Sequence, residues 1–386
     1  MIVAGYFLIF GVIMLLFNAS ASDVWKAWGV PAMDPHFGDL FNVVAGIENR
    51  DAGRAIGDPN PFDPWNRPYI YPSLWLEAKA IGFNRDTIDV FGWLIVLSFF
   101  ASVLALMGKL SADEGIFTGL FLISPAILTG VERGNIDLVL FPLILAAVAL
   151  RRHPSAVASL LILVTVLKIH PAGALLVFLA PPWRKTLPWL AGILGVLFLY
   201  ALTYGKELAV INAHAQHYPF LTFGSAVVGL WLAQMNPSGE PPDFHSLLFW
   251  GSVVLLLIGG AVLRFGPRVA PEARWDWELH AFRLGAGLHL ALFAVGASND
   301  YGMLFFLFCL PLLFRCWADT GPLRWWAALA LTSSLLYVNW NLFSDEYLLR
   351  HMLIKQALGW GLAASLIALL NATRSWPTIW LESKSA

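Results

Sequence analysis

The stretch IFTGLFLISPAILTGVERGNIDLVLFPLILAAVALRR, Ile116–Arg152, decides how this chain folds. Two apolar runs flank the polar turn Val131–Asp137, and two arginines follow the second run. That second run, Leu138–Leu150, gives only about 13 residues or roughly 20 Å of helix, against a hydrocarbon core of about 30 Å. The polar turn is therefore predicted to lie below the membrane surface. Irregular charged backbone at that depth requires surrounding protein or a water-filled cavity.

The composition extends the membrane interpretation to the whole chain. Hydrophobic residues make up 58% of the 386 residues, charged residues make up 13%, and the mean hydropathy is +0.68. No water-soluble core would need this excess of apolar residues. The net charge is −1, and the sequence contains no basic block, P-loop or dinucleotide fingerprint. We therefore expect no nucleic-acid partner. We expect an all-α polytopic membrane protein that forms one domain over residues 1–386.

About twelve apolar stretches are candidates for helices that cross the bilayer. They begin near Ile2, Val90, Ile116, Ile136, Ala156, Pro171, Leu187, Ser246, His280, Tyr301, Leu323 and His351. The first could also be a signal peptide, since Ala-Ser-Ala near Ser20 is a weak cleavage cue. Because it lacks a basic n-region, we interpret it as a retained anchor.

The basic residues favour one orientation of these spans. With a cytoplasmic N-terminus, the inner loops hold Lys109, Arg151, Arg152, Arg184, Lys185, Arg264, Arg268, Arg274, Arg315, Arg324, Arg374 and Lys384. The short outer loops hold Arg133, Lys168, Lys206, Arg350 and Lys355. The positive-inside rule therefore predicts that both termini are cytoplasmic.

The one long hydrophilic segment, residues 20–87, is then the first extracytoplasmic loop. Its middle, DPNPFDPWNRP at Asp58–Pro68, is rich in Pro, Asn and Asp and predicts irregular structure. The flanks Leu40–Ile56 and Leu74–Ile81 have near-helical apolar spacing, which is typical of amphipathic helices on the membrane face.

Asp39 stands at the start of the first of these helices and has two interpretations. An Asp before an apolar-periodic helix is a favoured N-cap. Alternatively, a carboxylate at the lip of a membrane cavity could accept a proton from a hydroxyl. The two roles are compatible, because a residue at a helix start can present its side chain to a cavity.

Ionisable residues gather beside two short predicted spans. The run from Ala156 to Leu167 is also short, so Lys168 and His170 are expected to lie on the same sunken side as Arg133. Glu132 and Arg133 could simply neutralise each other, and Lys168 could snorkel towards water. Ionisable residues inside membranes are costly and usually functional, however. A pocket with these cations would suit a phosphate.

Other polar clusters fall on the same predicted side. They are Asn212, His214, Gln216, His217 and Tyr218, the turn Ala297–Gly302 with Asn299, Asp300 and Tyr301, and the run Phe343–His351. The H-x-x-H spacing of His214 and His217 could indicate a metal, but no third ligand has a recognisable spacing. We therefore expect no metal. The turn at Asn299 could equally be an ordinary polar connection between two spans.

The order of these elements resembles the membrane glycosyltransferases of family 87, in the GT-C superfamily. The shared pattern is an Asp early in a long first outer loop, then Y-x-Y-P, a G-N turn, and K-x-H-P opening a later span. The matching stretches are Asp39–Gly46, Tyr69–Pro72, Glu132–Asn135 and Lys168–Pro171, and Asn299–Tyr301 resembles a later turn. The resemblance covers the first half well and the second half mainly through topology. Family members commonly have Gly-Gln where this chain has Gly134-Asn135.

The resemblance implies a GT-C-like fold and an inverting glycosyl transfer without cofactor. The donor would be a polyprenyl-phosphate-linked sugar, such as mannose, arabinose, glucose or galactose, and the acceptor a lipid or glycan. The reaction would occur on the periplasmic side of the inner (plasma) membrane. Asp39 would be the catalytic base, and Arg133, Lys168 and His170 would hold the donor phosphate. Further substrate-site candidates are Glu132, Asn135, Tyr71, His214, His217, Asn299, Asp300 and Tyr301.

Three other classes of protein stay open at this point. A lipid or glycan transporter or flippase would also have many spans and buried charges, although no internal repeat is visible here. An O-antigen-ligase-like transferase would place its large outer loop late in the chain, whereas here it comes first. The third class is a non-catalytic scaffold.

Overall fold

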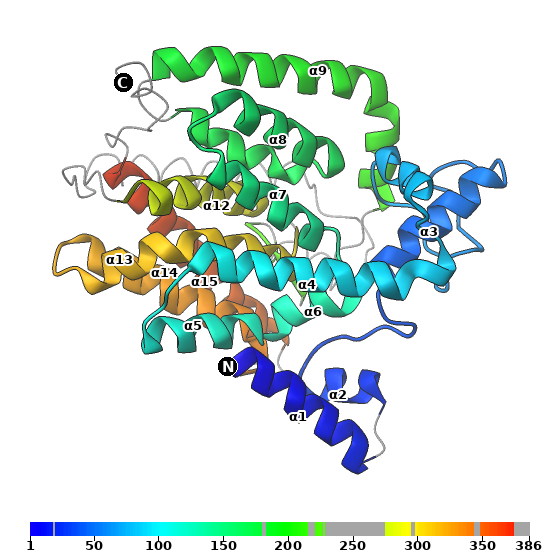
Figure 1. Cartoon of the computed structure of the whole chain (residues 1–386), viewed down its shortest axis with the longest axis horizontal. Helices are drawn as coiled ribbons and strands as arrows, with labels where there is room; N and C mark the ends of the chain where they lie inside the picture. The colour runs from blue at the N-terminus through cyan, green and yellow to red at the C-terminus, as the bar shows by residue number, and fades with distance from the viewer. Residues whose placement is uncertain are drawn as a thin grey trace.

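The computed structural model describes residues 1–17, 20–179, 183–214, 221–225, 227, 275–294, 298–342 and 348–373, which are mostly helical (Figure 1). The first part contains α1 (Ile2–Phe17), α2 (Ala21–Ala27), α3 (Gly38–Asp51), η1 (Ser73–Ile81), η2 (Arg85–Thr87), α4 (Ile88–Met107), α5 (Ala112–Leu122), α6 (Pro125–Arg133), α7 (Asp137–Ala149) and α8 (Pro154–Leu167). The chain continues with η3 (His170–Leu179), α9 (Trp183–His214), β1 (Thr222–Phe223), α12 (Asp276–Ala294), β2 (Ser298–Asn299), η6 (Asp300–Cys309), α13 (Leu310–Ala318), α14 (Leu323–Val338), η7 (Trp340–Leu342) and α15 (Leu348–Ala372).

Four described helical segments are long and apolar enough to cross a membrane. They are Arg85–Met107, Arg184–Ile211, Asp300–Ala318 and Arg350–Ala372, and the bent pair α5 and α6 would make a fifth. The count of about twelve spans stays a prediction, because the stretch near Ser246 lies outside the described residues. Moreover, α7 and α8 have only 13 and 14 residues, fewer than the roughly 20 that a straight span needs.

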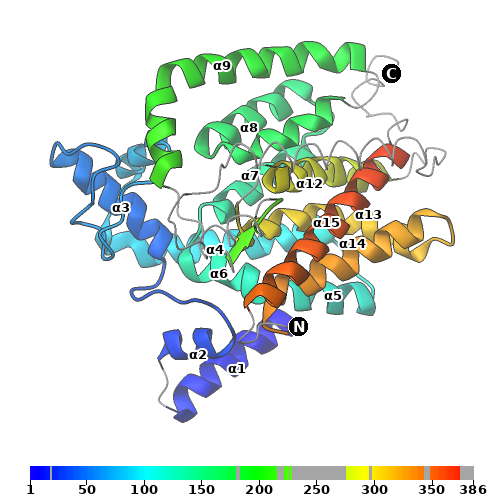
Figure 2. The ribbon, with the colours of Figure 1, turned by 180° about the vertical axis from the view of Figure 1, so that it is seen from behind.

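The long helices form a bundle with the first loop at one end. Figure 1 shows α9 and α4 running in a similar direction with α8 and α7 between them, with α3 beyond one end and the turn between α13 and α14 at the other. The opposite view keeps this order, with α12 and α15 on the near side (Figure 2). The first loop therefore lies where α4 begins and α8 ends.

Within the first loop, α3 packs against η1. The helix predicted over Leu40–Ile56 starts earlier and ends at Asp51, since Gly53 takes a φ of +70°. The approach is close at Gly46, where a Cβ atom would lie 2.4 Å from the Tyr69 ring. The Asn42 amide donates to the Pro68 carbonyl (3.1 Å) and accepts from the Ile70 N–H (3.3 Å). The loop is thereby fixed against α3.

The break between α5 and α6 redirects the chain towards this loop. The two helices meet at 55°, and Ser124 caps α6, its hydroxyl accepting from the Ile127 N–H. Pro125 occupies the first turn, where its missing N–H costs nothing. As a result, α6 ends beside α3, and the Phe37 N–H donates to the Glu132 carbonyl (2.9 Å).

The end of α6 requires a glycine. Gly134 has a φ of +59° in the left-handed region, and a Cβ atom there would lie 3.0 Å from the side chains of Leu40 and Phe37. Both the backbone conformation and the lack of space disfavour any other residue. The polar turn after α6 therefore depends on Gly134.

We expect Gly134→Ala to destabilise the protein, because an alanine in the left-handed region costs roughly 1–2 kcal/mol before any contact is counted. The readout is Tm in detergent, with a fall of roughly 1–3 °C. Gly115→Ala is the matched control, since a Cβ atom there meets open space. An unchanged Tm for Gly134→Ala would contradict the structural role of this turn.

Candidate active site

Asp39 is a buried carboxylate in the first turn of α3, with 5% of its surface exposed. The N-cap interpretation is wrong, because Phe37 occupies that position with a φ of +60° and no side chain caps the helix. Instead, Asp39 Oδ2 accepts a hydrogen bond from Asn135 Nδ2 at 2.5 Å. Asp39 Oδ1 lies 3.8 Å from Arg67 Nη1. The side chain thus points at the turn after α6 rather than at its own helix.

Arg67 is the cation nearest Asp39, and the sequence did not single it out. Its guanidinium bonds to Asp63 Oδ2 at 2.9 Å and to the Gly38 carbonyl at 2.5 Å. It also lies over the Trp65 ring, 4.5 Å from the centroid. These contacts hold Arg67 in place, so its charge faces Asp39 without a direct hydrogen bond.

Asn135 joins Asp39 to a second carboxylate. Its amide nitrogen donates to Asp39, and its amide oxygen accepts from the Asp137 N–H at 2.9 Å. The Asn135 N–H donates to the Gly130 carbonyl, also at 2.9 Å. Because Asn135 is completely buried, these partners fix the orientation of its amide.

Asp137 brings two of the three predicted phosphate-binding residues together. Lys168 Nζ lies 2.8 Å from Asp137 Oδ1, and His170 Nε2 lies 3.4 Å from the same atom. Lys168 follows the last residue of α8 in an extended conformation, so the end of this short helix places the Lys168 ammonium beside Asp137. Asp137 was not among the predicted site residues, although it lies at the centre of this group.

Glu132 and Arg133 do not neutralise each other by an ion pair. Glu132 Oε1 accepts from the Met33 N–H at 2.8 Å, while its Oε2 is buried without a hydrogen-bond partner in the described chain. Arg133 Nε is likewise buried and, among these residues, unpartnered. Arg133 Nε is therefore available to a ligand, whereas Lys168 Nζ already donates to Asp137.

Two tyrosines complete the group around Asp39. Burial raises the pKa of the Tyr71 hydroxyl well above its ordinary value, and the nearby Asp39 carboxylate adds to this effect. Tyr71 therefore stays protonated and can donate a hydrogen bond. Tyr301 lies within electrostatic range of Asp39 and Arg133, and its ring is 5.7 Å from Lys168 Nζ. Its hydroxyl accepts from Asn299 Nδ2 at 2.6 Å.

Asp300 belongs to a separate buried group. Asp300 Oδ2 lies 2.5 Å from Lys355 Nζ, and its Oδ1 accepts from the Tyr337 hydroxyl at 3.0 Å. Asn299 pairs with Thr222 between β2 and β1. The neighbours Asp300 and Tyr301 therefore serve different clusters, and the structure places only Tyr301 beside Lys168.

Of the predicted H-x-x-H pair, the described histidine lies apart from this group. His214 Nδ1 lies 2.8 Å from the Val210 carbonyl on an exposed part of α9, and His217 lies outside the described residues. Within the part of the chain that the structure describes, no three His, Cys, Asp or Glu residues are arranged to hold a metal ion.

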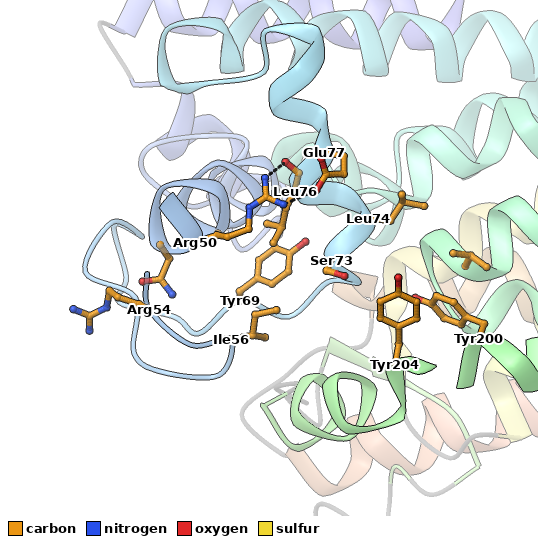
Figure 3. Close-up of a pocket in the computed structure, with 13 residues that line it drawn as sticks. Arg50, Arg54, Ile56, Tyr69, Ser73, Leu74, Leu76, Glu77, Tyr200 and Tyr204 are labelled. Atoms are coloured by element: carbon orange, nitrogen blue, oxygen red, sulfur yellow. Dashed lines mark hydrogen bonds and ion pairs between the residues drawn. The ribbon is translucent and has the colours of Figure 1, made fainter. Parts of the chain in front are cut away.

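Two cavities are lined by residues of the first loop. One, of about 440 Å³, lies between the first loop and α9 (Figure 3). The other, also about 440 Å³, lies beside α1 and α2 and is mainly apolar. Glu132 lines the apolar cavity and Tyr69 lines the other.

Comparison with known proteins gives no family assignment. No family model matches this chain, and neither a curated protein nor a solved structure is significantly similar to it.

The Asp137–Lys168 pair generates a stability prediction. Lys168→Met leaves Asp137 buried with only His170 beside it. Breaking a fully buried ion pair costs roughly 3–5 kcal/mol of folding free energy. Because the Lys168 side chain is 21% exposed, we expect a smaller loss of folding free energy, about 2 kcal/mol. The loss is measured as a lower Tm in detergent. The double variant Lys168→Met with Asp137→Asn should recover most of the loss. Equal Tm values for the native protein and Lys168→Met would contradict the pairing.

Proposed function

We propose that this protein is an inverting glycosyltransferase of the GT-C type. It transfers a sugar from polyprenyl phosphate to a lipid or glycan acceptor at the extracytoplasmic face of the inner membrane. The observation that carries the proposal is the setting of Asp39, a buried carboxylate that is oriented by Asn135, lies 3.8 Å from Arg67, and is linked through Asn135 to the Asp137–Lys168 pair. The apolar helices support a membrane location.

Asp39 has one oxygen free to act as a base. Oδ2 is engaged by Asn135, whereas Oδ1 receives no hydrogen bond from the described residues, since Arg67 at 3.8 Å is too distant. An acceptor hydroxyl would donate to Oδ1. As its oxygen forms the bond to C1, the proton passes to Asp39, the C1–O bond breaks, and polyprenyl phosphate leaves with the electron pair. Attack opposite the phosphate inverts C1.

The cations supply the other half of the chemistry. Negative charge grows on the departing phosphate, and charge-assisted hydrogen bonds are strong where water is scarce. Arg133 is the best-placed phosphate ligand, because its Nε has no partner among the residues described. Lys168 and His170 would contribute beside Asp137. No general acid is required, because a phosphate is already a good leaving group.

The apolar cavity supports a place for the prenyl chain. It is lined by Phe7, Phe10, Met14, Trp25, Phe37, Trp93 and Val131, among others. It adjoins the turn that carries Arg133. A lipid tail in this cavity would bring its phosphate towards the cations from the membrane side.

The first experiment removes the base. With purified protein, a synthetic polyprenyl-phosphate sugar and an acceptor, Asp39→Asn should reduce release of polyprenyl phosphate by roughly 10² to 10⁴-fold. Asp51→Asn, at the exposed end of the same helix, is the control and should retain activity. A transporter would move the donor without cleaving it. Normal turnover by Asp39→Asn rules out Asp39 as the base.

The second experiment tests the phosphate contact. Arg133→Ala should weaken binding of the polyprenyl-phosphate sugar by about tenfold or more, because a charge-assisted hydrogen bond contributes roughly 1.5–3 kcal/mol. Binding is measured by titration in detergent. Lys109→Ala, in the turn between α4 and α5, should leave the affinity unchanged. Equal affinity of the Arg133 and Lys109 variants would exclude Arg133 from the donor site.

A further inference from the structure

The cavity between the first loop and α9 has two unlike walls. Figure 3 shows Tyr200 and Tyr204 on α9, facing loop residues that include Tyr69, Arg50 and Glu77. The complete lining is Gly46, Asn49, Arg50, Arg54, Ile56, Tyr69, Ser73, Leu74, Leu76, Glu77, Val166, Tyr200 and Tyr204. One wall is therefore mainly aromatic, and the other carries several hydrogen-bonding groups.

The aromatic wall is suited to the C–H faces of a sugar ring. The Tyr200 and Tyr204 ring centroids are 4.9 Å apart with 36° between the planes, and 41% of Tyr204 is exposed. Tyrosine rings offer an apolar surface with a polar hydroxyl at its edge. A sugar, which has apolar C–H faces and hydroxyl edges, matches both features.

A buried amide on the opposite wall points to a hydroxyl ligand. Asn49 is only 3% exposed, and its Oδ1 is buried with no hydrogen-bond partner in the described part of the chain. Its Nδ2 donates to the Ala55 carbonyl at 3.3 Å, which leaves Oδ1 as the open acceptor. Unsatisfied buried acceptors are rare and costly. The oxygen itself is closed off from solvent, so a ligand hydroxyl in the cavity would satisfy it once the Asn49 amide turns towards the lining.

The walls are held at a fixed separation. Glu207 on α9 accepts from the Ser73 N–H at 2.7 Å, and the Trp75 indole donates to the Leu167 carbonyl at 2.9 Å. At the rim, Arg50 pairs with Glu77 at 2.5 Å (Figure 3). The pair carries no net charge, and the positive charge of Arg54 in the lining is matched by Glu207 on Ser73. The walls together therefore carry no net charge, which favours a neutral ligand over an anion.

The cavity adjoins the cluster around Asp39 through two chain segments. Tyr69 lines the cavity, and Tyr71, two residues later, lies near Asp39; their ring centroids are 6.2 Å apart. Similarly, Val166 lines the cavity, and Lys168 bonds to Asp137. The cavity and the proposed base therefore lie on neighbouring residues of the same two chain segments.

We propose that this cavity binds the saccharide of the acceptor as a neutral hexose or pentose unit. Tyr200 and Tyr204 stack on the ring, and Asn49 accepts from a hydroxyl. The assignment of this saccharide as the acceptor rests on the proposed glycosyl transfer, in which its free end approaches Asp39. Saccharide binding itself requires no catalysis and can be measured alone.

The test is saturation-transfer NMR on the full chain in nanodiscs. The probes are methyl glycosides and disaccharides of mannose, glucose, galactose and arabinose. At least one probe should bind, and Tyr200→Ala and Tyr204→Ala should each weaken it by roughly tenfold. Tyr204→Phe keeps the ring and should bind nearly normally. Phe198→Ala removes another exposed aromatic ring of α9 that does not line the cavity and should have no effect.

Three results would overturn the proposal. They are no binding by any probe, equal binding by Tyr204→Ala and Phe198→Ala, and loss of donor affinity rather than acceptor affinity in Tyr204→Ala. The last would assign the cavity to the sugar of the donor. If tyrosine-dependent binding occurs while Asp39→Asn turns over normally, only the base assignment fails. If Asp39→Asn is inactive and the tyrosine variants bind normally, only the acceptor site fails.

Discussion

The hydrogen bond from Asn135 to Asp39 joins segments 96 residues apart. The opposite end of the same amide accepts from the Asp137 N–H, so one side chain fixes α3, the end of α6 and the start of α7 relative to each other. All three side chains are buried, and water cannot replace a lost partner. This one amide therefore links Asp39 to the carboxylate that pairs with Lys168.

The two linked carboxylates differ in how closely their charge is compensated. Asp137 has Lys168 at 2.8 Å and His170 at 3.4 Å, whereas Asp39 has Arg67 only at 3.8 Å. A tightly paired carboxylate stabilises the fold but has little capacity for another partner. A loosely paired one keeps an oxygen open to a further hydrogen-bond donor. This difference, rather than burial, favours Asp39 over Asp137 as the base.

Local patterns in the sequence predicted the helical class, the short α7 and α8, and the polar turn beside Lys168 and His170. Run length and charge are local quantities, so they can be read without a structure. The partner of Lys168 is 31 residues away, and Arg67 depends on the irregular backbone around Asp63. Asp300 and Tyr301 were predicted together, yet the geometry of η6 sends them to different clusters. The partner that each polar side chain contacts is set by tertiary packing, which the pattern of one segment does not encode.

The arrangement along α3 bears on the stereochemistry of the proposed transfer. Phe37, at the N-cap, lines the apolar cavity, whereas Gly46, Asn49 and Arg50 line the polar one, and Asp39 lies between them in sequence. Inversion requires the acceptor to attack C1 from the face opposite the phosphate. A lipid tail entering from one end of α3 and a glycan from the other would approach Asp39 from different sides. The separation of the two cavities by this helix is therefore the feature that favours inversion over retention.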